Sequence, residues 1–396
     1  MDILNELIKQ YKHLYESDEN KRRLSLWSRP NEGIRGEFQW HGIPSYTVES
    51  NRPMPVTAEC LDKIWEDLLG LEQARYFTEP DYYLEFYLKI KIAKFQEFPD
   101  DTPLTMDIPL VFGVTHEAGI LGQGIILDSG EEPSFVKNSI VDEDTIFPTE
   151  FDFSGNPYLN DVAIPFYERI KEEAGEDFHI IFPHWYRGPQ GVALYIRGFQ
   201  EFSLDLYINP DFAHRLLRYV TDAAKAFYLW RKKFTGDSIM PGDLFNDDIP
   251  LMSPDMYRDF FYQYEKELCE FYGGIYYWHS CGDITQHVHE VHKLKDIDIL
   301  DFGVTMENKL TGMESLNRSQ TLEIRVMAQT HVQQCSEEES KKYIRGILED
   351  CRKMGINKYV LRSSGMSVVD GAVKDVKKLG RWVDLVREVQ EETRIG

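Results

Sequence analysis

The segment 275–283 reads IYYWHSCGD and ends a hydrophobic, strand-like run with a His-x-Cys pair. Side chains two residues apart on a β-strand point to the same side, so His279 and Cys281 would present an imidazole nitrogen and a thiolate together. Nitrogen and sulfur donors of this kind suit zinc. The spacing alone also fits a buried cysteine beside a hydrogen-bonded histidine, so the zinc interpretation depends on the rest of the chain.

Other residues with acid–base or metal-binding side chains fall at or just after predicted strands. In a βα-barrel the C-terminal ends of the strands share one face, and that face builds the active site. We therefore expect the following residues on one side of the molecule: His116, Glu117, His184, Arg187, Asp247, Asp248, His279, Cys281, His331, Cys335 and the segment 363–366.

His331 and Cys335 are the natural candidates to complete a zinc site with the His-x-Cys pair. Both follow a predicted strand over 324–330, and both are residue types that bind zinc. Cys335 also fits a surface turn that leads into a helix starting at Ser336. The sequence leaves both interpretations open.

Asp247 and Asp248 follow a strand predicted over 238–245 and precede Pro250, so they are not an ordinary helix cap. Adjacent carboxylates on a loop point in different directions, and we expect at most one of them to reach the site. It would serve as an acid or base, a metal ligand or a hydrogen-bond acceptor, whereas a solvated loop is the alternative. Glu117 is a candidate for a similar part.

Strands and helices alternate from residue 178 onward. Predicted strands cover 178–184, 238–245, 275–281, 298–304, 324–330 and 358–363, and helices lie between them. This order implies parallel strands joined by right-handed crossovers. Two more strands within the first 175 residues would close a (β/α)8 barrel. An open doubly wound sheet is the rival, but no G-x-G-x-x-G follows a first strand.

The first hundred residues have a different character. Residues 2–17 predict an amphipathic helix, 18–60 are irregular, 57–69 predict a helix with Thr57 as its N-cap, and 80–98 fit either a helix or extended chain. We therefore divide the chain into an N-terminal helical and irregular extension, 1–100, packed on a barrel that spans 101–396.

Composition excludes several classes of function. The net charge of −23 argues against nucleic acid and anionic lipid as partners. No apolar run approaches the roughly 20 residues that cross a bilayer. The first residues lack the features of a signal peptide, and the five cysteines form no CxxC. These features predict a cytoplasmic protein that acts on small molecules, with a homodimer left open.

Four segments resemble the uroporphyrinogen decarboxylase superfamily. They read RGPQGVA (187–193), FAHRLL (212–217), DDIPLMSPDMY (247–257) and HSCGD (279–283). The resemblance covers about 104–393, and the ordered combination of these segments is what makes it specific. It implies a (β/α)8 barrel of the TIM type with its active site at the C-terminal mouth.

One branch of that superfamily decarboxylates porphyrinogens and uses an arginine-rich N-terminal loop, which is absent here because the early arginines are scattered. The other branch contains corrinoid-dependent methyltransferases, whose zinc motif is His-x-Cys with a later cysteine. His279 and Cys281 match its first half, but Met366 stands where the later cysteine is expected. A thioether binds zinc weakly, so His331, Cys335 or a carboxylate would take over, or the metal is lost.

The resemblance therefore implies a methyltransferase that moves a methyl group between a small methylated donor or a thiol and a cobalamin-type corrinoid on a partner protein, assisted by zinc. The alternatives are a decarboxylase-like lyase and a metal-free binding protein on the same fold. The implied site has catalytic, substrate-binding and metal-binding members. These are, in that order, Asp247, Asp248 and Glu117; His116, His184, Arg187, Tyr277 and Met366; and His279, Cys281, His331 and Cys335.

Overall fold

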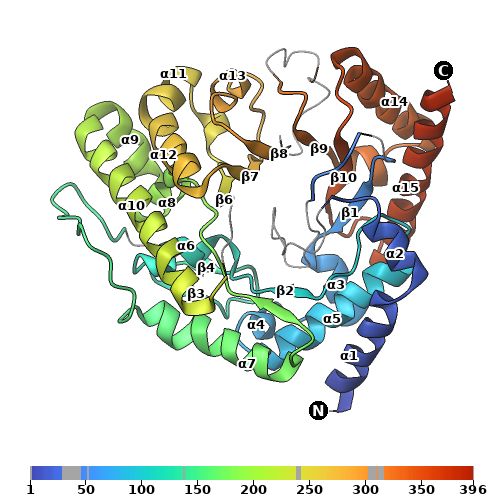
Figure 1. Ribbon diagram of the computed structural model, residues 1–396, viewed down its shortest axis with the longest axis horizontal. Coiled ribbons are helices and arrows are strands. Elements are labelled where there is room, and N and C mark those ends of the chain that lie inside the picture. The colour runs from blue at the N-terminus through green and yellow to red at the C-terminus, as the bar shows by residue number, and fades with distance from the viewer. Residues whose placement is uncertain are drawn as a thin grey trace.

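A ring of parallel strands surrounded by helices forms the centre of the molecule (Figure 1). The computed structural model describes residues 2–28, 46–50, 53–136, 139–237, 242–301, 310 and 316–395. Within these residues the parallel strands are β1 (Val56–Cys60), β2 (Asp107–Pro109), β5 (His179–Ile181), β6 (Gly242–Phe245), β7 (Ile275–His279), β8 (Ile297–Asp301), β9 (Thr321–Met327) and β10 (Tyr359–Met366).

The strand order accounts for most of the ring. Six of them pair as β1-β10-β9-β8-β7-β6, so the first strand of the chain lies beside the last. Strand β2 pairs with β5, and a single parallel bridge from Arg187 to Phe245 joins the segment after β5 to β6. Together with the family match reported below, this arrangement confirms the predicted (β/α)8 fold.

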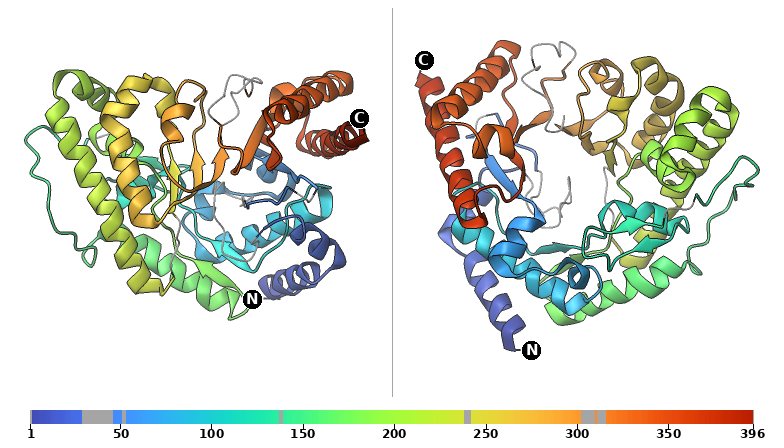
Figure 2. Two further views of the ribbon diagram at one scale, coloured as in Figure 1. Left: turned by 45° about the horizontal axis from the view of Figure 1, so that its top comes forward. Right: turned by 180° about the vertical axis from the view of Figure 1, so that it is seen from behind.

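Helices cover the outside of the ring in every view (Figure 2). The longer ones are α1 (Asp2–Tyr15), α5 (Pro80–Glu97), α7 (Ile164–Ala174), α8 (Pro189–Arg197), α9 (Phe199–Ile208), α10 (Pro210–Thr235), α12 (Tyr262–Tyr272), α14 (Glu337–Met354) and α15 (Ala372–Ile395). Helix α14 illustrates their start and stop signals. Ser336 and Glu339 form a capping box at its beginning, and Gly355 ends it with φ 70°.

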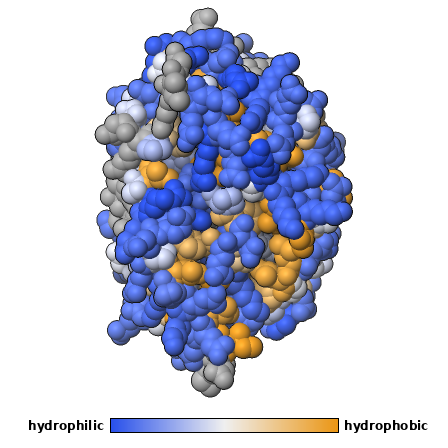
Figure 3. Space-filling view, turned by 90° about the vertical axis from the view of Figure 1, so that its right-hand side faces the viewer, coloured by the Kyte–Doolittle hydropathy of each residue, from blue (hydrophilic) through white to orange (hydrophobic). Residues whose placement is uncertain are grey.

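Ion pairs join α14 to α15 on the outer surface, for example Arg381 with Glu337 and Arg345 with Glu392. Figure 3 views the side of the molecule that lies at the right in Figure 1, and this face is mainly hydrophilic. Among the described residues, no helix combines the length and apolar character needed to cross a bilayer.

The strands are buried on both faces, as parallel sheets covered by helices must be. In β7 every residue is buried. Tyr277 packs with Tyr186, Phe245 and Ile299 in a small hydrophobic cluster shared by neighbouring strands. Because β7 pairs with both β6 and β8, its C-terminal end is held between two neighbours.

The prediction of a helix over 57–69 is wrong at its beginning. Residues Val56–Cys60 form β1, and α3 (Asp62–Leu69) starts only afterwards. Pairing with β10, about 300 residues further along the chain, outweighs the cap-like local signal at Thr57. Since β1 lies before residue 101, the sheet includes part of the range that the sequence assigned to an extension.

Two other expectations are settled by the described elements. The segment 80–98, which fitted helix or strand, is helix α5. The helix expected between the predicted strands 275–281 and 298–304 is reduced to the single turn α13 (Val288–Val291). The segment between β2 and β5 also contains a short antiparallel pair, β3 (Ile125–Ile126) and β4 (Ser134–Phe135).

Candidate metal centre

Three potential metal ligands meet at the C-terminal ends of β6 and β7. His279 is the last residue of β7, Cys281 follows two residues later, and Asp247 follows two residues after β6. The Nε2 atom of His279 lies 3.2 Å from Sγ of Cys281 and 3.1 Å from Oδ1 of Asp247. The three ligand atoms all lie within 4.8 Å of one another.

The pairing of β6 with β7 explains why these residues converge. Phe245 stands opposite His279 in the parallel ladder, and the backbone N–H of Asn246 donates to the carbonyl of His279 at 2.8 Å. Asp247 follows two residues after Phe245, and its Oδ1 faces Nε2 of His279. The backbone N–H of Cys281 donates to Oδ1 of Asp247 at 3.2 Å and ties the two loops together.

The donor set fits a zinc ion. Imidazole nitrogen, thiolate sulfur and carboxylate oxygen are the three kinds of protein ligand that zinc takes. His279 is buried, Asp247 is half-buried and Cys281 is exposed, so the group is reachable from one side. Three protein ligands leave the fourth position of a tetrahedral metal for substrate or water.

The carboxylates around His279 favour a positive charge on its imidazole ring. Burial lowers the pKa of His279, but the carboxylates of Asp301 and Asp247 outweigh it and raise the pKa well above its ordinary value. Asp301 accepts a hydrogen bond from Nδ1 at 2.6 Å. A divalent cation between Asp247 and His279 would take the place of the proton on Nε2.

Arg187 orients Asp247. Its Nη1 donates to Oδ2 of Asp247 at 3.0 Å, and its Nη2 lies 3.5 Å from Asp248. Although burial opposes it, the hydrogen bond from His279, together with Arg187, lowers the pKa of Asp247 far below its ordinary value. The guanidinium lies over the ring of Tyr195. A Cβ at Gly191 would approach Nε of Arg187 to 2.5 Å, so glycine leaves room for this side chain.

Of the two adjacent carboxylates, only Asp247 belongs to the metal-ligand cluster found among the described residues. Asp248 turns toward Arg187, and burial raises the pKa of its carboxyl group. In the thiol of Cys281, partial desolvation likewise raises the pKa, although the residue as a whole is exposed.

His331 and Cys335 do not join this cluster. His331 lies on the π-helical turn η6 (Gln329–Gln333), and its ring stacks on Tyr343 of α14 with the centroids 3.8 Å apart. Both residues line a separate surface pocket of about 620 Å³. The cluster found within the described part of the chain includes neither of them, so the metal role predicted for this pair has no support in its placement.

Glu117, His116 and His184 form hydrogen bonds away from the three ligands. Glu117 is buried, and its Oε1 accepts the backbone N–H groups of Tyr186 and Arg187 at 2.9 and 3.0 Å, which fixes the chain just before α8. His116 is bonded to Tyr158 at 2.9 Å, and burial lowers its pKa to about 3. His184 contacts the carboxylate of Asp243 at 3.0 Å.

Met366 is fully buried at the end of β10, where its backbone stands opposite Cys60 of β1. It therefore acts here as a core residue. Tyr277, in contrast, lies next to the cluster, because its hydroxyl donates to the same oxygen of Asp301 that accepts from His279.

Analysis of the sequence missed Asp301 and the charged residues beside it. Their only signal was the presence of charged side chains inside otherwise apolar strands, as in IDILD for β8 and TLEIRVM for β9. A charge in a buried strand needs a partner, and here that partner stands on the adjacent strand.

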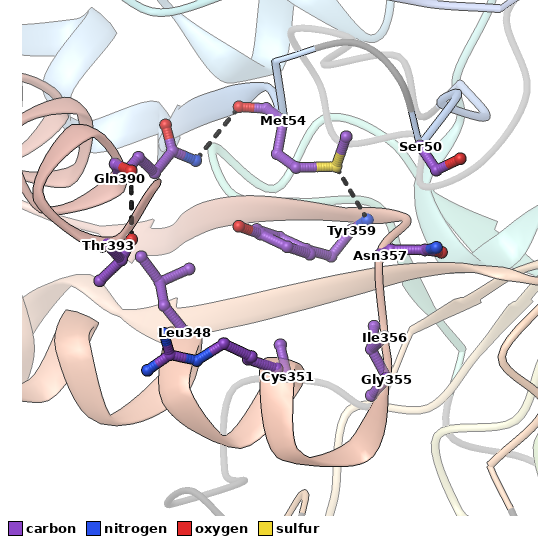
Figure 4. A pocket seen from close by; sticks show the side chains of 11 residues that line it. Ser50, Met54, Leu348, Cys351, Gly355, Ile356, Asn357, Tyr359, Gln390 and Thr393 are labelled. Atoms are coloured by element: carbon purple, nitrogen blue, oxygen red, sulfur yellow. Dashed lines mark hydrogen bonds between the residues drawn. The ribbon is translucent and has the colours of Figure 1, made fainter. Parts of the chain in front are cut away.

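A different pocket, of about 390 Å³, lies between the end of α14, the start of β10 and the end of α15 (Figure 4). Met54, Leu348, Cys351 and Tyr359 contribute to its walls, and Gln390 donates to the carbonyl of Met54 at 3.2 Å. Among the described residues, the lining holds no carboxylate and no histidine. It is a crevice between packed elements, and Cys351, whose side chain is buried, is the one thiol among the described residues that line it.

Comparison with known proteins identifies relatives at the level of family and fold. The family described as Uroporphyrinogen decarboxylase (URO-D) matches residues 90–387. A solved structure described as a methyltransferase from Methanosarcina mazei superimposes with a TM-score of 0.56 and 17% sequence identity, covering 85% of this chain and 95% of that chain. A search of curated proteins finds no match. At this identity the structural likeness establishes the fold alone.

Proposed function

Since this chain belongs to the uroporphyrinogen decarboxylase family, we propose that it is a zinc-assisted methyltransferase. It would move a methyl group between a small methylated donor or a thiol and a corrinoid carried on a partner protein. The observation that carries the proposal is the convergence of Asp247, His279 and Cys281 at the mouth of the barrel. The likeness to a methanogen methyltransferase is compatible with it.

In this proposal Asp247 is the third zinc ligand. The cysteine that the methyltransferase branch is expected to provide is replaced by Met366, which is buried in the core. Asp247 comes from a different strand and brings an anionic oxygen to within 3.1 Å of His279. The thiolate of Cys281 and the carboxylate of Asp247 would each carry one negative charge. Together they would balance the 2+ charge of zinc.

The residues of the chain would divide the work as follows. Asp301 holds Nδ1 of His279, which directs Nε2 toward the cluster. Arg187 holds one oxygen of Asp247 and leaves the other facing His279. Zinc, when bound, would act as a Lewis acid that lowers the pKa of a thiol or withdraws charge from a leaving heteroatom.

A partner that carries the corrinoid would reach the site from the mouth of the barrel. The exposure of Cys281 at the end of β7 supports an approach from that side. The corrinoid would carry the methyl group. The barrel would bind and orient the substrate and exclude water from the site.

Metal analysis followed by a transfer assay tests the proposal. Protein purified without chelators should carry about one zinc per chain, and His279→Ala or Cys281→Ser should lose it. The same preparations are then mixed with reduced cobalamin and a panel of methyl ethers, methylamines and methyl thioethers, and methyl–cobalt formation is followed by absorbance. The reverse reaction uses methylcobalamin and small thiols.

Two results would contradict the proposal. The first is folded, zinc-loaded protein that transfers no methyl group in either direction with any member of the panel. The second is zinc-free protein that decarboxylates a porphyrinogen, which would place the chain in the lyase branch. The matched control is Asp248→Asn, since Asp248 lies beside Asp247 but outside the cluster.

A further inference from the structure

The carboxylate of Asp301 is the junction of a buried polar network behind the metal centre. Its Oδ2 is contacted by Nδ1 of His279, the hydroxyl of Tyr277 and Nη2 of Arg325, each at 2.6 Å. Asp301 ends β8, and its partners come from β7 and β9 on either side of it. All of these side chains are buried, so water does not compete for the oxygen.

The network continues away from the metal centre. The hydroxyl of Tyr277 also lies 3.0 Å from Oε1 of Glu323, and the same Oε1 accepts from Nη1 of Arg362 at 2.6 Å. The ladder explains this alignment, because Asp301 stands opposite His279 on one side and opposite Glu323 on the other. Arg325 and Arg362 are also direct neighbours across β9 and β10.

Burying four charged side chains inside a barrel costs stability unless each charge is paired and hydrogen-bonded. Apolar residues of similar volume would often be at least as stabilising. Within the network, Asp301 lies beside Arg325 and Glu323 beside Arg362. Its end nearest the mouth contacts a member of the metal cluster through Nδ1 of His279. That contact gives the network a use beyond packing.

We propose that Tyr277 and Arg325 are positioning residues for the metal centre. They fix Asp301, and Asp301 in turn keeps the Nδ1–H of His279 on its own side, so that Nε2 is presented to Asp247 and Cys281. This inference rests on one part of the proposed function, namely that the cluster of Asp247, His279 and Cys281 binds a divalent cation. Hydrogen-bond partners of metal-bound histidines commonly change metal affinity by about 10–100-fold when removed.

The variants follow from the contacts. Tyr277→Phe removes one donor to Asp301 and keeps the ring in the core. Asp301→Asn keeps the size and removes the charge. A matched control is Tyr186→Phe, because Tyr186 lies in the same hydrophobic cluster as Tyr277 but its hydroxyl donates to the carbonyl of Gly113.

The readout is the metal itself. Cobalt(II) replaces zinc in the full-length protein, and its visible absorption bands report the geometry of the ligands. Zinc affinity is measured by competition with a chromophoric chelator. Tyr277→Phe and Asp301→Asn should shift the cobalt bands and weaken zinc binding by about 10–100-fold, whereas Tyr186→Phe should leave both unchanged.

Several outcomes would overturn the inference. Tyr277→Phe and Asp301→Asn with wild-type cobalt spectra and zinc affinities would reduce the network to a structural role. Wild-type protein that binds neither metal at the cluster would overturn it as well. Zinc binding with the expected variant effects but without any methyl transfer would instead defeat the proposed function and leave the positioning role intact. If Asp301→Asn does not fold, the cobalt spectrum and the zinc affinity of Arg325→Lys test the inference in its place.

Discussion

The chain carries two His–Cys pairs near the ends of barrel strands, and their surroundings differ. His279 and Cys281 are two residues apart at the end of β7, where a carboxylate from β6 meets them. His331 and Cys335 are four residues apart after β9, and His331 lies on the turn η6, which ends before Cys335. His279 is buried between two carboxylates, whereas His331 stacks on a tyrosine.

Residue type alone is therefore less informative about a metal site than the element that holds the residues. A strand end fixes the direction of alternate side chains and sets them beside the next strand, which can supply a further ligand. A residue beyond the end of a helical turn has no such constraint. The second pair therefore faces a surface pocket with the side chains of α14, and no third ligand joins it among the described residues.

The largest expected effect separates the two pairs directly. His279→Ala should abolish stoichiometric zinc binding, with affinity reduced by more than the roughly 100-fold typical of losing only a supporting partner. His331→Ala should change zinc affinity less than twofold, about 0.4 kcal/mol, since the metal-ligand cluster found among the described residues does not include His331. Competition with a chromophoric chelator measures both. Equal losses in the two variants would refute the distinction.

Removing zinc with a chelator should show which of the two His–Cys pairs holds a metal that stabilises the fold. A ligand that binds only the folded state at 100 times its dissociation constant adds about 2.7 kcal/mol. For a chain of this length that is about 3 °C in Tm, from the average unfolding entropy per residue. Adding EDTA should lower the Tm of wild type and of His331→Ala by this amount.

Under the same conditions the Tm of His279→Ala should not respond to EDTA, because that variant has no zinc to lose. Differential scanning calorimetry measures all three proteins in parallel. A chelator response that persists in His279→Ala would locate the metal elsewhere in the chain.

How much of this could be foreseen depends on where the partners lie in the sequence. Cys281 follows two residues after His279 at the end of β7, so the local spacing was enough to place them together. The choice between Asp247 and Asp248 was not decidable locally, because it depends on the register of β6 against β7 and on the position of Arg187. Asp301 was missed for the same reason, because its hydrogen-bond partners lie on the neighbouring strands β7 and β9.

Long-range pairing also explains the error at β1. Residues Val56–Cys60 contain a threonine that resembles a helix cap, and their short run of strand-favouring residues is a weak local signal. Their partner in the sheet is β10, near the other end of the chain. Helix α14, in contrast, was predictable over 336–354, because its capping box and terminal glycine are encoded within the element itself.

A smaller effect tests the third ligand. Asp247→Asn keeps the shape of the side chain but removes its charge, and an amide is a poorer zinc ligand than a carboxylate. Zinc affinity should fall by about 10–100-fold, or about 1.4–2.7 kcal/mol. The neighbouring Asp248→Asn should have little effect, because Asp248 is outside the cluster.

The same competition assay measures both aspartate variants, and circular dichroism checks that they fold. An unchanged affinity in Asp247→Asn would mean that the third ligand is another group. A comparable loss in Asp248→Asn would show that the effect comes from the charge of the loop and that no specific carboxylate is responsible.

The smallest effect concerns the second pair and should appear in stability alone. Tyr343→Leu removes the ring that stacks on His331 at 3.8 Å. Aromatic pairs of this kind contribute about 0.5–1.5 kcal/mol beyond the area they bury, so the free energy of unfolding should fall by about that amount. Denaturant titration measures it, with zinc affinity expected to stay at the wild-type value. If zinc affinity fell as well, the pocket beside α14 would be coupled to the cluster at β7, and the two His–Cys pairs would have to be treated as one site.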